Sequence, residues 1–276
     1  MKNADLHCHS TASDGLLAPA EVVRRAAANG VDLLALTDHD DIAGLADARA
    51  AAESMGMAFV SGVEVSIEWE SLQIHVVGLG FDTADAALNA GLAGIRSGRI
   101  ERARRMSAEL EKAGIGGAFE GAMRHSENPN LVSRAHFARY LVETKVCKDV
   151  RSVFESWLVP GKPGYVEHRW ASVADCVAWI KGAGGIAVLA HPARYKLSSG
   201  ALRRFLGEFR DLGGEGIDVV CGSHSPDDIG VFGRLAREFG FLASRGSDFH
   251  GPQESYVDLG RLAPLPDGLK PVWESF

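Results

Sequence analysis

Residues 4–9 read Ala-Asp-Leu-His-Cys-His, a short apolar strand that ends in two alternating histidines. Successive side chains of an extended chain point to opposite faces, so His7 and His9 share one face while Cys8 takes the other. Two imidazoles on one face are a common arrangement of metal ligands. Two exposed histidines are the alternative, less favoured than a metal site, so the meaning of the pair depends on the rest of the chain.

Histidines or carboxylates also follow, or interrupt, other short apolar runs. Residues 31–36 read as a buried strand, and core packing does not explain the Thr37-Asp38-His39-Asp40 cluster that follows. Glu64 lies inside the apolar strand predicted over residues 58–65, where a carboxylate is costly unless it is paired or binds a metal. The other such residues are Asp14 in a Ser-Asp-Gly turn, His75 in the strand predicted over residues 73–79, His191 after residues 186–190, and Asp248 and His250 after residues 241–244.

Helical segments alternate with these strands. One helix is predicted to begin at Pro19 and end at Gly30, and the next to be capped by Asp40 or Asp41. This alternation favours an α/β fold with a largely parallel sheet or barrel. In such folds the carboxyl ends of the strands converge on the active site. Further helices are predicted to begin at Ser172 and Ser225, a further strand over residues 216–220, and a polar connection with Trp69 and Glu70 between residues 65 and 73.

The alternation stops between about residues 85 and 165, where helical patterns appear without a convincing strand. We expect one α/β domain over residues 1–276, interrupted there by a helical insertion. Two interpretations of the insertion stay open: a solvated helix pair, or a lid that recognises the substrate. Its basic run from Arg96 to Arg105 is interpreted as a solvated helix face, with attraction of RNA phosphates as the alternative.

The composition restricts the function classes. Acidic residues outnumber basic ones, 36 to 29, which argues against a broad basic surface for nucleic acid. No run reaches the roughly 18 apolar residues of a membrane span, and residues 1–10 lack the apolar segment of a signal peptide. The four cysteines form no CxxC pair. We therefore expect a cytoplasmic protein with free thiols, no membrane association and no obligate protein partner.

Ten histidines are an unusual content for an acidic chain, and six of them join the set described above. Nine imidazoles and carboxylates are too many for one ion, so we expect two or three, with Glu64 as the bridging carboxylate. Nitrogen and oxygen ligands without cysteine indicate Zn²⁺, Mn²⁺ or Fe²⁺. Closely spaced divalent ions activate water and neutralise charge on phosphoryl oxygens, so hydrolysis is the predicted chemistry. The candidate ligands are His7, His9, Asp14, His39, Glu64, His75, His191, Asp248 and His250.

In order and spacing these motifs resemble the PHP (polymerase and histidinol phosphatase) superfamily. The resemblance implies a distorted (β/α)₇ barrel, an active enzyme and three divalent ions, with Mn²⁺ preferred over Zn²⁺ or Fe²⁺. The motifs are His7-x-His9, Asp14-Gly15, Thr37-Asp38-His39, Gly62-x-Glu64, His75, Ala190-His191-Pro192 and Ser247-Asp248-x-His250. By the family pattern the first ion would be held by His7, His9, Glu64 and Asp248, the second by Glu64, His75 and His191, and the third by Asp14, His39 and His250.

Within the superfamily the chain looks most similar to the stand-alone nucleoside 3′,5′-bisphosphate phosphatases and 5′→3′ exoribonucleases that act on short RNA. We therefore expect a nucleotide-binding hydrolase that removes the 3′-phosphate of a nucleoside 3′,5′-bisphosphate and leaves the 5′-monophosphate. A 5′→3′ exoribonuclease is the first alternative and histidinol phosphatase the second. A non-catalytic metal sensor or scaffold is the alternative of a different class.

Five residues outside the ligand set are candidates for substrate contact. Ser133 and Arg134 lie at a predicted helix start, an arrangement that binds phosphate, although a cap with a solvent-facing arginine fits the pattern as well. His224 follows a predicted strand and is a candidate for contacting the scissile phosphate or protonating the leaving oxygen, with an exposed loop histidine as the alternative. Lys162 and Arg194 are candidates for further phosphate contacts, and Lys162 reads slightly better as an ordinary loop residue. The catalytic roles are predicted for His224 and Arg134.

Overall fold

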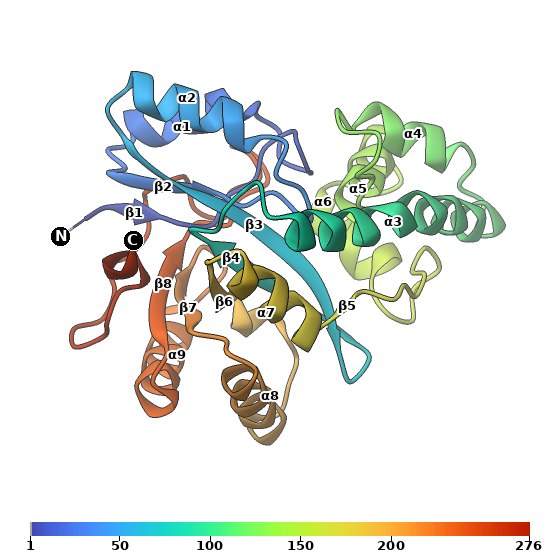
Figure 1. The fold of residues 1–276 in the computed structure, drawn as a ribbon. Helices are drawn as coiled ribbons and strands as arrows, with labels where there is room; N and C mark the ends of the chain where they lie inside the picture. Colours follow the sequence, from blue (N-terminus) through green and yellow to red (C-terminus); the bar gives the residue numbers. More distant parts are fainter. Residues whose placement is uncertain (1) are drawn as a thin grey trace.

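The fold is described by a computed structural model that covers residues 2–276, in which one strongly curved sheet is surrounded by helices (Figure 1). The strands run in the order β1-β2-β3-β4-β6-β7-β8, and the short β5 pairs with β3 outside this order. The strands are β1 (Ala4–Asp5), β2 (Leu33–Leu36), β3 (Ala58–Trp69), β4 (Leu72–Leu79), β5 (Ala171–Ser172), β6 (Ile186–Leu189), β7 (Gly216–Cys221) and β8 (Leu242–Gly246).

The two ends of this strand order meet, so the sheet closes into a barrel. The Leu6 N–H donates to the Arg245 carbonyl over 2.9 Å, and the Asp248 N–H donates to the His7 carbonyl over 2.7 Å. All neighbouring pairs are parallel except β3–β4 and β4–β6, which are antiparallel. The distorted (β/α)₇ barrel that the family resemblance implies is confirmed, and the reversed strand β4 is part of its distortion.

The reversal of β4 follows from the connection before it, where the expected polar connection is much shorter than predicted. β3 continues through Trp69, and the turn consists of Glu70 and Ser71, both with positive φ (44° and 63°). Two residues with positive φ form a tight hairpin, which makes the joined strands antiparallel. Trp69 is buried, and its indole N–H donates to Glu208 over 2.7 Å.

Helices cover the outside of the barrel (Figure 1). The predicted ends of two of them are confirmed: Pro19 stands at the first position of its helix with Gly30 just beyond the end, and Ser225 and Gly240 cap another. One helix was not predicted, although Phe205 and Phe209 follow helical spacing and are buried. The five are α1 (Pro19–Ala28), α2 (Leu45–Ser54), α7 (Val173–Gly182), α8 (Ser199–Asp211) and α9 (Pro226–Phe239).

The prediction that Asp40 or Asp41 caps α2 is wrong. The helix begins after Gly44. Asp41 instead accepts hydrogen bonds from the backbone of Ile42 and Ala43, and so stabilises a turn ahead of the helix. Asp40 accepts from the Ser66 N–H over 2.6 Å, which ties the loop after β2 to β3. These aspartates therefore stabilise the loop that carries His39.

The strands are buried on both faces, as a closed barrel requires. On β2, Leu34 and Leu36 pack in the apolar layer between sheet and helices. The alternate residues Leu33 and Ala35 belong to a separate cluster on the opposite face, which Val272 near the C-terminus also joins.

Between β4 and β5 the regular structure is helical, and this segment lies to one side of the barrel (Figure 1). It has its own apolar cluster, in which Phe137, Leu141 and Leu158 are fully buried. We call residues 86–158 the helical insertion. It contains α3 (Ala86–Lys112), α4 (Ala118–Arg124), α5 (Arg134–Glu143), α6 (Val150–Val153) and a π-helical turn (Phe154–Leu158).

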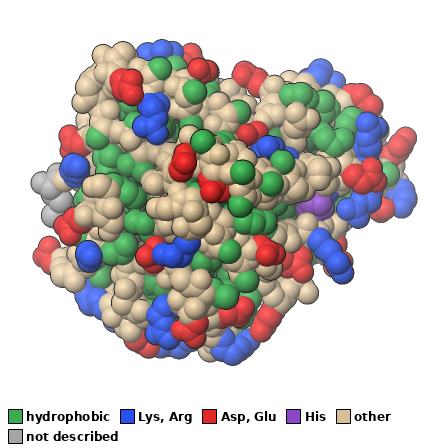
Figure 2. Space-filling view, viewed as in Figure 1, with side chains coloured by type: hydrophobic (Ala, Val, Ile, Leu, Met, Phe, Trp, Pro, Cys, Tyr) green, Lys and Arg blue, Asp and Glu red, His purple; other side chains and the backbone are tan. Residues whose placement is uncertain are grey.

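On the face shown in Figure 2, acidic and basic side chains are interspersed and form no extended basic stretch. Across residues 2–276, no helix has both the length and the apolar character needed to cross a bilayer.

Candidate metal centre

Glu64 lies at the centre of the imidazole cluster. It projects from β3 with no exposed surface, and both of its carboxylate oxygens face histidine rings. A carboxylate this deeply buried is stable only among groups that compensate its charge. Its Oε1 lies 3.3 Å from His7 Nε2, 2.9 Å from His75 Nδ1 and 2.8 Å from His191 Nε2, and its Oε2 lies 3.2 Å from His9 Nε2 and 3.0 Å from His39 Nδ1.

Two aspartates extend the cluster on either side. Asp248 Oδ1 lies 3.3 Å from His9 Nε2 and 3.7 Å from His7 Nε2. Asp14 Oδ1 lies 3.4 Å from His250 Nε2 and 3.9 Å from His39 Nε2. The structure therefore brings all nine predicted residues into one cluster at one end of the barrel.

Ligand atoms within this cluster fall into three groups whose members lie within 4.8 Å of one another. The first group is the set expected for the first ion. The second contains His39 where His191 was expected, and the third contains His9 in addition to the three expected residues. His191 lies beside the second group through its contact with Glu64. The groups are His7, His9, Glu64 and Asp248; His39, Glu64 and His75; and His9, Asp14, His39 and His250.

The donor set fits divalent cations. Buried polar atoms in proteins nearly always have a hydrogen-bond partner. Here several atoms of the cluster have none: His7 Nε2, both ring nitrogens of His9, Asp14 Oδ1, His39 Nδ1, Glu64 Oε2 and Asp248 Oδ1. Imidazole nitrogens and carboxylate oxygens without thiolates suit Zn²⁺, Mn²⁺ and Fe²⁺.

The carboxyl groups are ionised. Burial alone would raise the pKa of Glu64, but the imidazoles of His39, His75 and His7 hold it well below its usual value. Burial likewise opposes ionisation of Asp248, and Arg194 is the main group that holds the pKa of this carboxyl well below its usual value. Both carboxylates are thus available as ligands near pH 7.

Two of these residues have unusual backbone conformations. His191 has φ of 29° and Asp248 has φ of 55°, values that non-glycine residues rarely adopt. Such strain persists only where the surrounding structure enforces it, and it concentrates at functional sites.

A carboxylate that the sequence reasoning missed supports two of the histidines. Asp218 projects from β7 and is 1% exposed. Its Oδ2 accepts from His7 Nδ1 and from the His191 N–H, each over 3.0 Å. A partner of this kind fixes which ring nitrogen a histidine presents to a metal. The detectable signal was an aspartate inside the apolar strand Gly216–Cys221, the same signal that identified Glu64.

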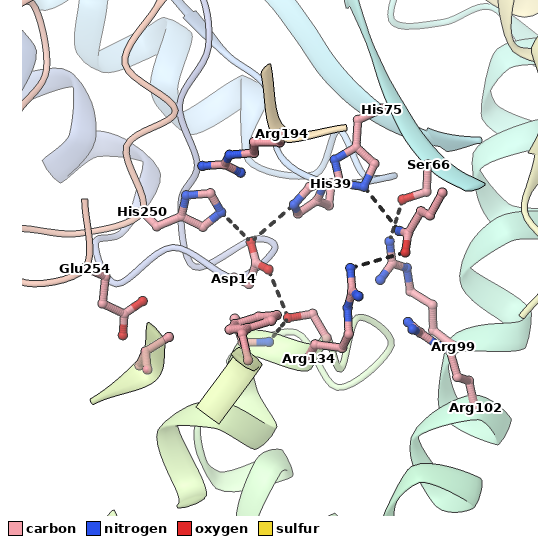
Figure 3. A pocket seen from close by; sticks show the side chains of 15 residues that line it. Asp14, His39, Ser66, His75, Arg99, Arg102, Arg134, Arg194, His250 and Glu254 are labelled. Carbon is pink, nitrogen blue, oxygen red and sulfur yellow. Dashed lines mark hydrogen bonds and ion pairs between the residues drawn. The ribbon is translucent and has the colours of Figure 1, made fainter. Parts of the chain in front are cut away.

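A cavity of about 230 Å³ lies over the cluster, between the barrel and the helical insertion (Figure 3). Barrel residues Asp14, His39, His75 and His250 line one side. Arginines from the insertion point into it from the opposite side (Figure 3). The lining comprises Asp14, His39, Ser66, Gln73, His75, Arg99, Arg102, Ser133, Arg134, Ala135, Val150, Phe154, Arg194, His250 and Glu254.

The prediction that Arg96–Arg105 forms a solvated helix face is wrong for its central residues. Arg99 and Arg102 are each 4% exposed and line the cavity, whereas Arg104 and Arg105 are exposed. The reason is the spacing along α3: positions 99 and 102 continue the apolar series of Leu88, Leu92, Ile95, Met106 and Leu110, in steps of three or four residues that share one helix face.

The arginines of the insertion that line the cavity differ in their partners. Arg99 forms an ion pair with Asp40, which joins the insertion to the barrel. Arg102 and Arg134 have no carboxylate partner among the described residues; Arg102 Nε donates to the Val166 carbonyl over 3.3 Å, and Arg134 Nη2 donates to Gln73 Oε1 over 3.2 Å. Burial and the neighbouring arginines lower the pKa of Arg102 to about 9, so it remains largely cationic near pH 7.

The other predicted substrate contacts have different locations. Ser133 caps α5 and its Oγ donates to Asp14 Oδ2 over 2.9 Å, and Arg194 pairs with Asp248 at the cavity wall. His224 is half-buried and is not among the lining residues; its Nδ1 lies 3.0 Å from the Val219 carbonyl. Lys162 is exposed and does not line the cavity either.

Known proteins with the same sequence features allow the family to be assigned. A family model described as the PHP domain matches residues 5–157. A 3′,5′-nucleoside bisphosphate phosphatase of Chromobacterium violaceum is 54% identical over 273 residues, which cover 99% of this chain and 96% of that protein. A 5′-3′ exoribonuclease of Haemophilus influenzae is 42% identical over 275 residues, which cover 100% of this chain and 99% of that protein.

A solved structure from Chromobacterium violaceum, described as an amidohydrolase with bound sulfate and no metal, has a TM-score of 0.97 to this chain at 53% sequence identity. The match covers 99% of this chain and 95% of the solved one. Because the family model matches more than half of the chain and these relatives align with nearly all of it, the chain belongs to the PHP domain family.

Proposed function

We propose that this protein is a metal-dependent phosphoesterase that removes the 3′-phosphate from nucleoside 3′,5′-bisphosphates and leaves nucleoside 5′-monophosphates. The proposal rests on one observation: a single cavity joins the nine-residue cluster to the buried Arg102 and the half-buried Arg134, and neither cation has a carboxylate partner in residues 2–276. Cations that lie in a cavity without a carboxylate partner call for an anionic ligand. A substrate with two phosphates on one ribose would satisfy both ends of the cavity. The name of the 54% identical relative supports this choice.

We propose three divalent ions, with Mn²⁺ preferred over Zn²⁺ or Fe²⁺. When bound, they would supply an activated water and neutralise charge on the phosphoryl oxygens. The buried, unpaired nitrogen and oxygen atoms of the cluster support this proposal. The residues that would hold the ions are His7, His9, Asp14, His39, Glu64, His75, His191, Asp248 and His250.

The chain's own side chains would bind and orient the substrate. Arg134, at the start of α5, and Arg102 would bind the 5′-phosphate, so the insertion would act as the substrate-recognition element. Arg194 would stabilise charge at the reacting phosphoryl group, the role predicted from the sequence for Arg134, since the Arg194 guanidinium lies at the cavity wall beside Asp248.

His224 remains our candidate for protonating the leaving 3′-oxygen. Its Nδ1 donates to the Val219 carbonyl, so Nε2 must take up a proton before it can pass one to the 3′-oxygen, and burial, which lowers the pKa of this ring, opposes that uptake. The substitution His224→Asn tests this role: kcat should fall for a substrate with a poor leaving group and much less for an activated aryl phosphate. Equal losses for both substrates would contradict it.

A second function, 5′→3′ exoribonuclease activity on short 5′-phosphorylated RNA, is favoured by the same arginines. They would hold the 5′ end of an RNA as they would hold the 5′-phosphate of a mononucleotide, and the 42% identical relative bears that name. Nucleotides and short RNA are thus the partners we propose. The cytoplasm is the compartment we propose, since all four cysteines are free thiols.

The experiment is a phosphate-release assay on purified, Mn²⁺-loaded protein with adenosine 3′,5′-bisphosphate. A ladder of 5′-phosphorylated oligoribonucleotides and histidinol phosphate are assayed in parallel, with chelator-treated protein as the control. We expect phosphate release from the bisphosphate that the chelator abolishes. Fully metal-loaded protein that releases none would contradict the proposal, and cleavage of the ladder alone would identify the exoribonuclease.

A further inference from the structure

We propose that Arg139 is a positioning residue through which the helical insertion holds one end of the metal cluster, the group of His9, Asp14, His39 and His250. This inference rests on the proposed metal centre. Arg139 lies on α5, outside the cluster, and is 7% exposed. Two loops of the barrel supply Asp14 and His250, and Arg139 contacts both loops.

The first contact is with the Asp14 loop. Arg139 Nη2 donates to the Asp14 carbonyl over 2.5 Å, while Ser133 Oγ at the start of the same helix donates to Asp14 Oδ2 over 2.9 Å. α5 therefore fixes both the backbone and the side chain of Asp14. The carboxylate oxygen left over, Oδ1, is the one that faces His250 and His39.

The second contact is with the loop that carries His250. Arg139 Nε and Nη2 donate to the two carboxylate oxygens of Glu254, each over 2.8 Å. In the same loop Ser255 Oγ accepts from the His250 N–H over 2.7 Å. The loops are joined directly as well, because the Leu16 N–H donates to the His250 carbonyl over 2.7 Å. The Arg139 guanidinium thus joins the two loops in addition to this direct hydrogen bond.

The opposite end of the cluster does not depend on the insertion. His7 is held by Asp218 of the barrel strand β7. The backbone just before Asp248 is held by Asp5 of β1, which accepts from the Ser247 N–H over 2.8 Å. Loss of Arg139 should therefore weaken one ion and leave the others bound.

The expected effect is large because the contacts are buried. Removing Arg139 leaves Glu254, which is 16% exposed, with an uncompensated charge beside the cluster. Groups that orient ligands without touching the metal typically change metal affinity by about 10–100-fold when they are replaced. We expect a loss in this range for the most weakly held ion.

The test measures bound metal, not activity. Wild-type protein and the variants Arg139→Lys, Arg139→Gln and Glu254→Gln are dialysed against a series of Mn²⁺ concentrations, and the ions per chain are counted by mass spectrometry. Arg203→Gln is the matched control, because Arg203 makes a similar two-oxygen contact with Glu238 between α8 and α9. Circular dichroism of the metal-free proteins establishes that each variant is folded.

We expect the three variants to bind one ion fewer than wild type at a concentration that saturates wild type, with Arg139→Lys affected least and the control unaffected. Unchanged binding curves, or an equal loss of every ion, would overturn the inference. If a variant keeps all its ions but loses phosphate release, Arg139 is not a positioning residue for the metal, while the proposed function stands. If wild type binds only two ions yet releases phosphate, then the group of His9, Asp14, His39 and His250 holds no ion and Arg139 does not position one. The proposed reaction again stands.

Discussion

Glu64 and Arg102 are residues of opposite charge that occupy apolar positions of their elements. Glu64 interrupts the apolar run of β3, and Arg102 continues the buried series of α3. Burying either charge costs free energy, and the apolar neighbours in the same strand or helix do not offset this cost. For Glu64 the imidazoles of the site offset this cost, because they surround the carboxylate. The Arg102 guanidinium lies beside the cavity, where the proposed substrate phosphate would offset it.

The substitution Glu64→Gln tests the central carboxylate. The amide keeps the shape but loses the charge that faces five imidazoles, so metal binding should weaken by more than the roughly 10–100-fold typical of supporting residues. Bound Mn²⁺ and phosphate release are the measurements, and both should fall together. A variant that retains the wild-type metal content would show that Glu64 is not a ligand.

The substitution Arg102→Gln tests the proposed 5′-phosphate contact. A charge-assisted hydrogen bond is worth about 1.5–3 kcal/mol, so kcat/KM for adenosine 3′,5′-bisphosphate should fall about 10–100-fold. Adenosine 3′-monophosphate, which has no 5′-phosphate, should be turned over at nearly the wild-type rate. Arg105→Gln is the control, because Arg105 lies on the same helix but is exposed. Equal losses with both substrates would rule out this role.

At the scale of elements, α5 begins inside the site. Ser133 caps it and contacts Asp14, and the Ser133 N–H donates to His136 Nδ1 over 3.0 Å. Burial lowers the pKa of His136 to about 3, so the ring stays neutral and accepts this bond near pH 7. The capping arrangement thus depends on an uncharged histidine.

This histidine makes stability depend on pH. In unfolded protein its pKa is near 6.5, so between pH 6.5 and about 3 the unfolded state binds the extra proton, and stability falls as the pH falls. From pH 7 to pH 5 the loss should be about 2 kcal/mol. Urea unfolding of metal-free wild type and His136→Gln at both pH values measures it. Between the two pH values the free energy of unfolding of the variant should fall by about that much less than that of wild type. Equal losses in both proteins would show that His136 does not cause this pH dependence.

Which elements could be predicted depends on how local their determinants are. Helix ends such as Pro19 and Gly240 were predicted because their signals lie within a few residues. The strand ends that carry the ligands were found for the same reason. The antiparallel direction of β4 depends on the left-handed conformations of Glu70 and Ser71, neither of which is a glycine, so the sequence offered no signal.

The arginines of α3 show a different limit. A basic run is ordinarily solvated, and only the apolar residues at matching spacing identified Arg99 and Arg102 as members of the buried face. Arg139 and Glu254 are 115 positions apart, and no local pattern connects them. Contacts between the insertion and the barrel could therefore not be predicted from the sequence.

At the scale of the whole molecule, the barrel supplies the candidate metal ligands and the insertion supplies cations. The chain has a net charge of −7, yet this cavity places buried arginines opposite the cluster. Net charge therefore describes the surface of this protein and not its site.

Metal binding should stabilise the entire fold, because nine side chains from distant parts of the chain converge on the cluster. Each ion present at about 100 times its Kd adds about 2.7 kcal/mol, which corresponds to a rise in Tm of about 5–10 °C per ion for a domain of this size. Calorimetry before and after dialysis against a chelator, with Mn²⁺ added back, measures it. An unchanged Tm would mean that the ions do not bind the folded state in preference to the unfolded one.

The measurement that most directly tests whether one cavity recognises two phosphates is the ratio of kcat/KM for adenosine 3′,5′-bisphosphate to that for adenosine 3′-monophosphate, determined with the metal-loaded wild-type protein. We predict a ratio of about 100 or more, from two guanidinium groups, those of Arg102 and Arg134, that each contribute a charge-assisted contact. A ratio near one would show that the 5′-phosphate is not recognised and would contradict the proposed function.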